Sequence, residues 1–189
     1  MPLFYVPSVA AVLVGCLLPL VYVAYTDCRY YLIYDRATYA IALAGLVAAI
    51  YEGRLVDAVA GAVLGFGVVF VFCLLKGAGG GDLKLATALG TWFGPYQMPF
   101  IFLAASLIGI PWGLYKKVRS GEKVGEWAKT FFRGIYLRAF YGTPGAIPLP
   151  ELPEDDDAPV PSEAIPFGAC LAAAAWLDWF LQIFHFWHI

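Results

Sequence analysis

Long apolar runs separated by short polar stretches constrain the fold of this chain more than any other feature. Of its 189 residues, 61% are hydrophobic and only 14% are charged, whereas about a quarter of residues are charged in an average soluble domain. Lipid cannot satisfy the polar groups of an exposed backbone, so segments that cross a bilayer fold as regular hydrogen-bonded structure. The sequence therefore predicts an all-α integral membrane protein with the lipid bilayer as its surroundings.

The apolar runs predict six transmembrane helices within a single domain of residues 1–189. The third predicted helix carries Gly61 and Gly65 at GxxxG spacing, which is typical of a close-packing helix face. The fourth is short and ends at Gly94-Pro95. No Lys or Arg precedes the first run, so we expect a retained helix and not a cleaved signal peptide. The predicted spans are residues 7–25, 37–51, 55–75, 83–93, 98–115 and 165–186.

One long polar segment, residues 116–163, interrupts this pattern before the last span. Residues 126–141 mix basic and aromatic side chains and predict an interfacial amphipathic helix. Residues 148–162 are rich in proline and acidic side chains, which is typical of a disordered tether. A second interpretation is that this acidic tract attracts a basic peptide electrostatically.

The basic residues predict the orientation of the chain in the membrane. With six spans, only Arg54 among the 12 Lys and Arg falls on one side. The positive-inside rule then places both termini outside the cell membrane and puts Asp27 and Asp82 at the cytoplasmic face. The net charge of −2 argues against a basic surface for nucleic acid.

A glycine-rich stretch before Asp82 is the least helix-like part of the apolar sequence. Glycines occupy positions 77, 79, 80 and 81, and each costs about 1 kcal/mol in a helix relative to alanine. We therefore expect a glycine-rich break, followed by the short fourth helix from Leu83. Asp82 has two interpretations: an N-cap of that helix, or a functional carboxylate on a loop at membrane depth.

Asp27 and Asp82, predicted on the same side, suggest paired carboxylate chemistry. Two carboxylates held close in a low-dielectric site do not both ionise easily, so one retains its proton. An aspartic protease uses such a pair, one acid activating a water and the other polarising the scissile carbonyl. The alternative is two unrelated acids at the membrane interface.

Three short motifs resemble those of the type IV prepilin peptidases. The GxGD-x-K motif of that family resembles Gly79-Gly80-Gly81-Asp82-Leu83-Lys84-Leu85. Its first motif, Asp-x-Arg-x-x-x-Ile-Pro-Asn, is similar to Asp27-Cys28-Arg29 followed by Ile33, although Tyr34-Asp35 replaces Pro-Asn. Its late Ile-Pro-Phe-Gly resembles Ile165-Pro166-Phe167-Gly168.

The resemblance implies that Asp27 and Asp82 are the catalytic pair, supported by motif residues Gly79 and Gly81, with no metal or cofactor. The reaction would remove the basic leader of prepilin-like precursors, cutting after a glycine at the cytoplasmic membrane face. The sequence does not distinguish pilin, pseudopilin and archaellin-like precursors and favours no oligomeric state. The family's larger members carry a methyltransferase region with two CxxC pairs. This sequence has no CxxC pair, so N-methylation is not expected.

The remaining polar residues are weaker candidates. Arg29 and Lys84 either tune the acids or hold substrate, or they are positive-inside anchors. Asp178, between Trp176 and Trp179, is expected to be solvated or paired in the aromatic belt. His185 and His188 make a poor metal site, because no carboxylate or thiol is near them in sequence.

A different class of function also fits the composition. A small non-catalytic membrane protein could use Asp27 and Asp82 for proton or cation passage, or for assembly. Such a protein is expected to line a path with further polar groups in mid-span.

Overall fold

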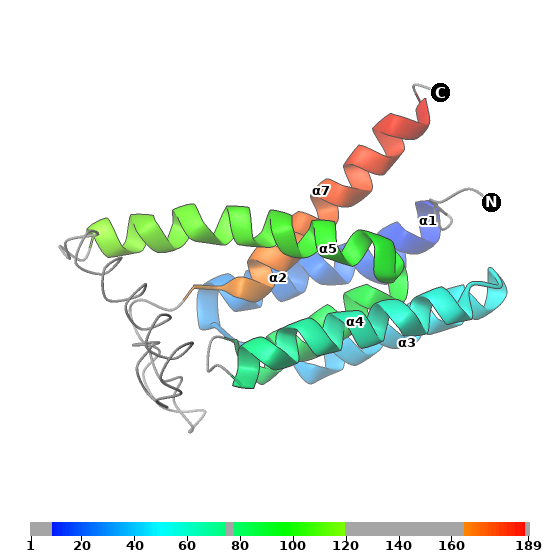
Figure 1. The fold of residues 1–189 in the computed structure, drawn as a ribbon, viewed down its shortest axis with the longest axis horizontal. Helices are drawn as coiled ribbons and strands as arrows, with labels where there is room; N and C mark the ends of the chain where they lie inside the picture. Colours follow the sequence, from blue (N-terminus) through cyan, green and yellow to red (C-terminus); the bar gives the residue numbers. More distant parts are fainter. Residues whose placement is uncertain (1–8, 75–77, 120–164, 188–189) are drawn as a thin grey trace, which may run out of the picture. The chain divides into compact units, whose positions relative to one another are not determined.

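The computed structural model describes residues 9–74, 78–119 and 165–187, and every regular element in them is helical (Figure 1). The all-α prediction is confirmed for this part of the chain. The predicted interfacial helix at 126–141 and the acidic tether at 148–162 lie outside it. The elements are α1 (Val9–Val12), η1 (Leu13–Leu17), α2 (Leu18–Tyr30), α3 (Asp35–Tyr51), α4 (Leu55–Leu74), α5 (Gly80–Arg119) and α7 (Phe167–Trp187).

The chain divides into two compact units, residues 1–108 with 166–189, and residues 109–165. The first unit contains both candidate acids and the described helices up to residue 108, together with α7. Within it α2 packs on α7, α3 packs on α4, and the π-helical turn η1 contacts α3 and α7.

The first three elements follow one another without a gap from Val9 to Tyr30. The π-helical turn η1 directly precedes the α2 turn that contains Pro19. Proline lacks an N–H, and its ring clashes with the carbonyl four residues earlier in an α-helix, so a wider turn relieves the clash.

The helix then continues past its predicted end at residue 25, so Asp27 lies inside the last turn of α2 and not in a polar stretch after it. Tyr31 ends the helix with a left-handed backbone (φ 54°), and its N–H donates to the Asp27 carbonyl at 2.9 Å. This is a common way for a helix to terminate.

Helix α5 contains the break that the sequence predicts at Gly94-Pro95. Gly94 has φ 68° and ψ 178°, a left-handed φ that glycine adopts without steric cost. The chain changes direction sharply there (Figure 1). As a result, residues 80–93 form a short helical segment of their own, and a second segment runs from Pro95.

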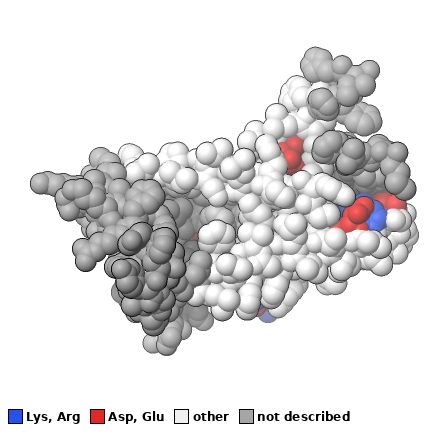
Figure 2. All heavy atoms as spheres, viewed as in Figure 1, with Lys and Arg blue, Asp and Glu red and all other residues white. Residues whose placement is uncertain are grey.

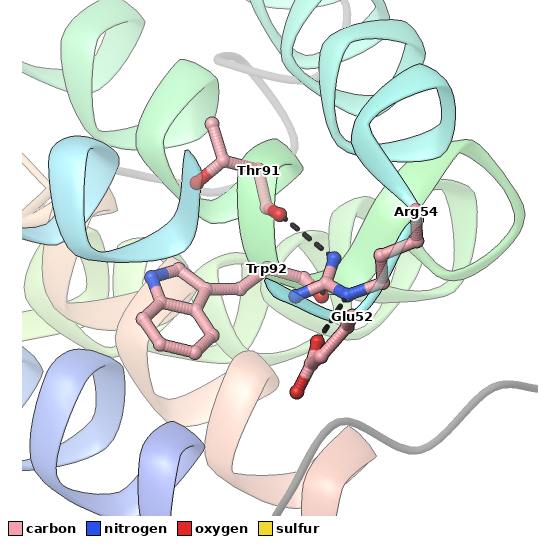
Figure 3. Close-up of polar contacts among 4 residues, drawn as sticks. All are labelled: Glu52, Arg54, Thr91 and Trp92. Atoms are coloured by element: carbon pink, nitrogen blue, oxygen red, sulfur yellow. Dashed lines mark hydrogen bonds and ion pairs between the residues drawn. The ribbon is translucent and has the colours of Figure 1, made fainter. Parts of the chain in front are cut away.

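Arg54 closes the end of this short segment (Figure 3). Its Nη1 donates to the carbonyl oxygens of Thr91 at 3.0 Å and Trp92 at 3.2 Å. In an unbroken helix the Thr91 carbonyl would accept from residue 95, but Pro95 has no N–H to give. The Arg54 Nε in turn donates to Glu52 at 2.7 Å. The guanidinium thus supplies donors that the helix itself lacks.

Small residues bring α4 and the first half of α5 into close contact. A methyl group added to Gly61 would collide with the carbonyl oxygen of Gly90, and one added to Gly65 would collide with that of Ala86. The predicted close-packing face of Gly61 and Gly65 is therefore confirmed.

Trp92 fixes the same segment to the other helices. Its indole Nε1 donates to the Ile41 carbonyl of α3 at 2.9 Å. Its ring fills the space beside Gly15 and Gly45, where an added methyl group would lie 2.7 Å from a ring carbon and 2.9 Å from Nε1. The short segment, residues 80–93, therefore packs against η1, α3 and α4.

Four helices among the described residues are long and apolar enough to cross a membrane: Val9–Tyr30, Leu55–Leu74, Gly80–Tyr115 and Phe167–Phe184. The predicted count of six spans is not confirmed. Helix α3 has 17 residues, and the predicted fourth and fifth spans form one element bent at Gly94. On the face in view, the described surface carries few charged side chains (Figure 2). Large apolar side chains such as Val56 and Tyr51 are exposed, as expected for a multi-pass membrane protein.

Candidate active site

Asp27 reaches across from α2 to the start of α7. Its side chain is buried, with 5% of the residue exposed, and its Oδ2 accepts a hydrogen bond from the Ala169 N–H at 2.7 Å. The first N–H groups of a helix have no partner within the helix, and its N-terminus carries a partial positive charge. Pro166, which precedes α7, has no side-chain acceptor to offer. A carboxylate from another helix therefore caps α7.

Gly168 makes this approach possible. A Cβ atom placed on Gly168 would lie 3.0 Å from Oδ2 of Asp27 and 2.5 Å from Cδ1 of Ile33. Both contacts are tighter than a side chain normally tolerates. The glycine of the late Ile-Pro-Phe-Gly motif thus leaves room for the Asp27 carboxylate.

Asp82 lies in the first turn of α5, which begins at Gly80 and not at the predicted Leu83. Its Oδ2 accepts a hydrogen bond from the Gly79 N–H at 3.1 Å, and the residue is half-buried. An acid at the third helical position that reaches back to the amide before the helix is one half of a capping box. Asp82 therefore contributes to the helix start, as the capping interpretation expects, without being the N-cap itself.

The glycine-rich break is shorter than predicted within the described residues. Gly80 and Gly81 already belong to α5, and residues 75–77 lie outside the described part. The Gly79 carbonyl accepts from the Cys73 thiol at 3.6 Å. Because the Gly79 N–H also binds Asp82, this glycine is held on both sides.

The structure brings the two predicted acids to helix starts that share a neighbour. Ile33 lies against Gly81, which precedes Asp82, and against Gly168, which also borders the Asp27 carboxylate.

The two predicted basic residues lie differently. The Lys84 ammonium pairs with both carboxylate oxygens of Asp35 at 2.6 and 2.7 Å, in an exposed position. The Arg29 guanidinium is exposed and lies 5.9 Å from the ring centre of Tyr30. Neither forms a hydrogen bond with Asp27 or Asp82 within the described residues.

Asp35 is not recognisable from the sequence as the partner of Lys84, because 49 residues separate them in the chain. Ile33 and Gly168 had no predicted role beyond their place in the motifs. The motifs could have pointed to these two residues, because Ile33 has a fixed spacing from Asp27 and Gly168 lies at the start of the last span.

Asp178 is paired, which is one of the two outcomes predicted for it. Only 7% of the residue is exposed, and its Oδ2 accepts from the Gln182 side chain at 2.5 Å, one helical turn away. It is thus paired and not solvated. The side chain of His185 and the whole of His188 lie outside the description, and no group of three or more His, Cys, Asp or Glu among the described residues could hold a metal ion.

Fold and site together define a multi-pass helical membrane protein in which two carboxylates, Asp27 and Asp82, each bind a backbone amide beside a helix start. Residues 12–114 match the type IV leader peptidase family, and the chain belongs to that family. It is similar to the prepilin leader peptidase/N-methyltransferase of Escherichia coli, with 39% identity over 49% of this chain and 45% of that protein. The Dichelobacter nodosus protein of the same name is 30% identical over 65% of this chain and 49% of that protein.

The chain thus spans about half the length of these two curated relatives. No protein of solved structure matches it.

Proposed function

We propose that this protein is an intramembrane aspartic endopeptidase that removes the basic leader from prepilin-like precursors. The observation that carries the proposal is that Ile33 lies against both the helix start that carries Asp82 and the helix start that binds Asp27, although 55 positions separate the two acids in the sequence. The family and the names of the similar proteins support the same reaction class. Their names also include N-methyltransferase, and the proposal covers peptide cleavage alone.

The proposed chemistry needs one ionised and one protonated acid. The ionised carboxylate takes a proton from water as the water oxygen attacks the scissile carbonyl carbon. The protonated acid donates a hydrogen bond to the carbonyl oxygen and stabilises the tetrahedral intermediate. Collapse of this intermediate breaks the C–N bond, and a proton passes to the leaving nitrogen. One water is consumed, and no covalent enzyme intermediate forms.

The backbone hydrogen bonds fix the orientation of the acids for this chemistry. Each carboxylate binds a backbone N–H through Oδ2, at 2.7 Å for Asp27 and 3.1 Å for Asp82. A side chain anchored to a helix start does not need to be ordered again when substrate binds, and such preorganisation lowers the barrier.

The proposed setting is the cell membrane, with six spans, both termini outside and the site facing the cytoplasm. The positive-inside distribution supports this orientation. The break at Gly94 supports counting residues 80–93 and the segment from Pro95 as separate passes. Residues 1–189 would then form one membrane peptidase domain, with 116–163 as its cytoplasmic segment.

The test is cleavage of precursors by the purified full-length protein in detergent or liposomes. Pilin, pseudopilin and archaellin-like precursors are incubated with it, and any cut is mapped by mass spectrometry. We expect one cut after the glycine that ends the basic leader. A precursor whose leader Lys and Arg are replaced by Ser is the matched control. No cut in any precursor, while the Escherichia coli relative cuts the same samples, would refute the proposal.

A further inference from the structure

The short connection between α2 and α3, residues 31–34, lies against the starts of α5 and α7. Ile33 is its only buried residue, with 9% exposed. Its neighbours Leu32 and Tyr34 are exposed, at 43% and 42%. The connection thus places a single apolar side chain inside the protein.

Ile33 lies against a glycine on each side. A Cβ atom on Gly81 would lie 3.0 Å from the Ile33 Cβ, and one on Gly168 would lie 2.5 Å from its Cδ1. Gly81 directly precedes Asp82, and Gly168 directly precedes Ala169, whose N–H binds Asp27. Ile33 therefore touches the start of α5, which carries Asp82, and the start of α7, which binds Asp27.

The chemistry of isoleucine suits a spacer. A β-branched side chain has few accessible χ1 rotamers, so its width at the contact is well defined. The two glycines bring backbone, not flexible side chains, against it. Its Cβ faces Gly81 and its Cδ1 faces Gly168, so the separation of the two helix starts depends on the reach of the side chain from Cβ to Cδ1.

A second contact from the same part of the chain acts on the same helix. Asp35, the first residue of α3, pairs with Lys84 of α5. Because the pair is exposed, solvent and salt weaken it. The Ile33 contact is buried, so solvent and salt do not weaken it in this way.

We propose that Ile33 is a positioning residue that sets the distance between the Asp27 and Asp82 carboxylates. This inference rests on the proposed function for its meaning, but the spacing itself is a physical property that can be measured without a substrate. It assigns Ile33 no contact with the scissile bond.

The kinetic test compares Ile33→Ala and Ile33→Val with Leu32→Ala, which truncates the exposed neighbour. We expect Ile33→Ala to lower kcat by about 100-fold, the cost of misplacing catalytic groups by about 1 Å. KM should stay within about twofold, because uniform substrate binding is unchanged. Ile33→Val keeps the branched Cβ that faces Gly81 but loses the Cδ1 that faces Gly168, so its kcat should fall between those of the parent and Ile33→Ala, while Leu32→Ala should match the parent. Equal kinetics for Ile33→Ala and Leu32→Ala would overturn the inference.

The second test needs no cleavage. Asp27→Cys and Asp82→Cys are combined in a full-length chain whose four natural cysteines are replaced by Ala, and the rate of oxidative cross-linking is measured. Disulfide formation depends steeply on separation. Adding Ile33→Ala should raise the rate severalfold, and adding Leu32→Ala should not change it.

An unchanged rate with Ile33→Ala would overturn the spacer whatever the enzyme does. A raised rate in a protein whose parent cleaves no precursor would support the spacer and refute only the proposed function.

Discussion

Asp27 and Asp82 serve the fold as well as the candidate site, because each carboxylate accepts a backbone N–H beside a helix start. Any substitution that removes the acceptor therefore disturbs a helix together with the chemistry. Asparagine is the informative replacement, because its side-chain oxygen still accepts a hydrogen bond and only the acid is lost.

We predict that Asp27→Asn and Asp82→Asn each lower kcat by about 100-fold to 10,000-fold, the range of general acid–base catalysis. Asp178→Asn is the matched control, a buried carboxylate of α7 bonded to Gln182, and it should leave kcat within about twofold. The measurement is precursor cleavage with equal amounts of purified protein. The parent should show a bell-shaped pH profile, because one acid must be charged and the other neutral. Near-parent turnover by either Asn variant would exclude the pair.

Two adjacent glycines provide a second pair of matched variants. An added methyl group on Gly81 would lie 3.0 Å from Ile33, whereas one on Gly80 meets nothing within 4 Å. We predict that Gly81→Ala lowers kcat by about tenfold to 100-fold through displacement of Asp82. Gly80→Ala should retain activity and gain up to about 1 kcal/mol of stability from helix propensity. Equal activities would assign the glycines no role in spacing.

The two candidate acids could be predicted from the sequence, but the residues that contact them could not. Asp82 was recognisable because an acid beside glycines in apolar sequence is unusual, and Asp27 because the charge distribution put it on the same side. The hydrogen bond from Ala169 to Asp27 links residues 142 positions apart, and no local pattern encodes such a pairing.

Among the elements, the short first half of α5 depends on Arg54. This side chain is buried and gives two hydrogen bonds to the end of that segment. Its Nη2 is also buried and has no acceptor among the described residues, which offsets part of the gain. Its net contribution is therefore smaller than the number of its hydrogen bonds suggests.

We predict that Arg54→Met lowers the free energy of unfolding by about 1–3 kcal/mol, the cost of leaving buried carbonyls without donors. This corresponds to a fall in Tm of about 2–4 °C per kcal/mol. Arg36→Met, at an exposed position of α3, should leave Tm unchanged. Thermal unfolding in detergent measures both, and an equal Tm for the two variants would show that the cap is not needed.

The contact between α4 and α5 is tested by two glycines of one helix. Gly61 lies against the backbone of Gly90, whereas Gly67 has open space around it. We predict that Gly61→Ala destabilises the protein by about 1–3 kcal/mol because the two backbones must separate. Gly67→Ala should be neutral or slightly stabilising. Chemical or thermal unfolding measures the stability of both variants. If Gly61→Ala is as stable as the parent, the close contact between α4 and α5 does not require a glycine at position 61.

Element types were predictable and several boundaries were not. Gly94 and Pro95 predicted the break in α5, because glycine is unfavourable in a helix and proline lacks the N–H that a helix needs. The end of α2 was predicted too early, because residues 26–30 are polar and resemble a loop at the membrane edge. They remain helical up to Tyr31, whose left-handed conformation is unusual for a residue that is not glycine.

For the whole molecule, the distribution of basic residues is the main evidence for orientation. Arg54, the exception, is buried and paired with Glu52. It therefore acts as part of the protein interior, and the contrast between the two sides is stronger than the count of basic residues suggests.

We predict the orientation from reporter fusions. Alkaline phosphatase joined after Gly53 or after residue 189 should be active, because both points are expected outside the cell membrane. Green fluorescent protein joined after residue 119 should fluoresce, because that point is expected in the cytoplasm. The reciprocal fusions serve as controls and should be inactive. The opposite pattern would reverse the proposed topology.

The break at Gly94 also has a consequence for biosynthesis. Residues 80–93 span about 20 Å at about 1.5 Å per residue, whereas the hydrocarbon core is about 30 Å thick. A nascent segment this short is a weak stop for the translocon, so we expect it to enter the bilayer together with the segment from Pro95, as a hairpin. Arg54 is synthesised first, and its guanidinium gains the Thr91 and Trp92 carbonyls only when that hairpin arrives. Insertion of the hairpin and closure of the cap would then be a single late step in the assembly of the protein.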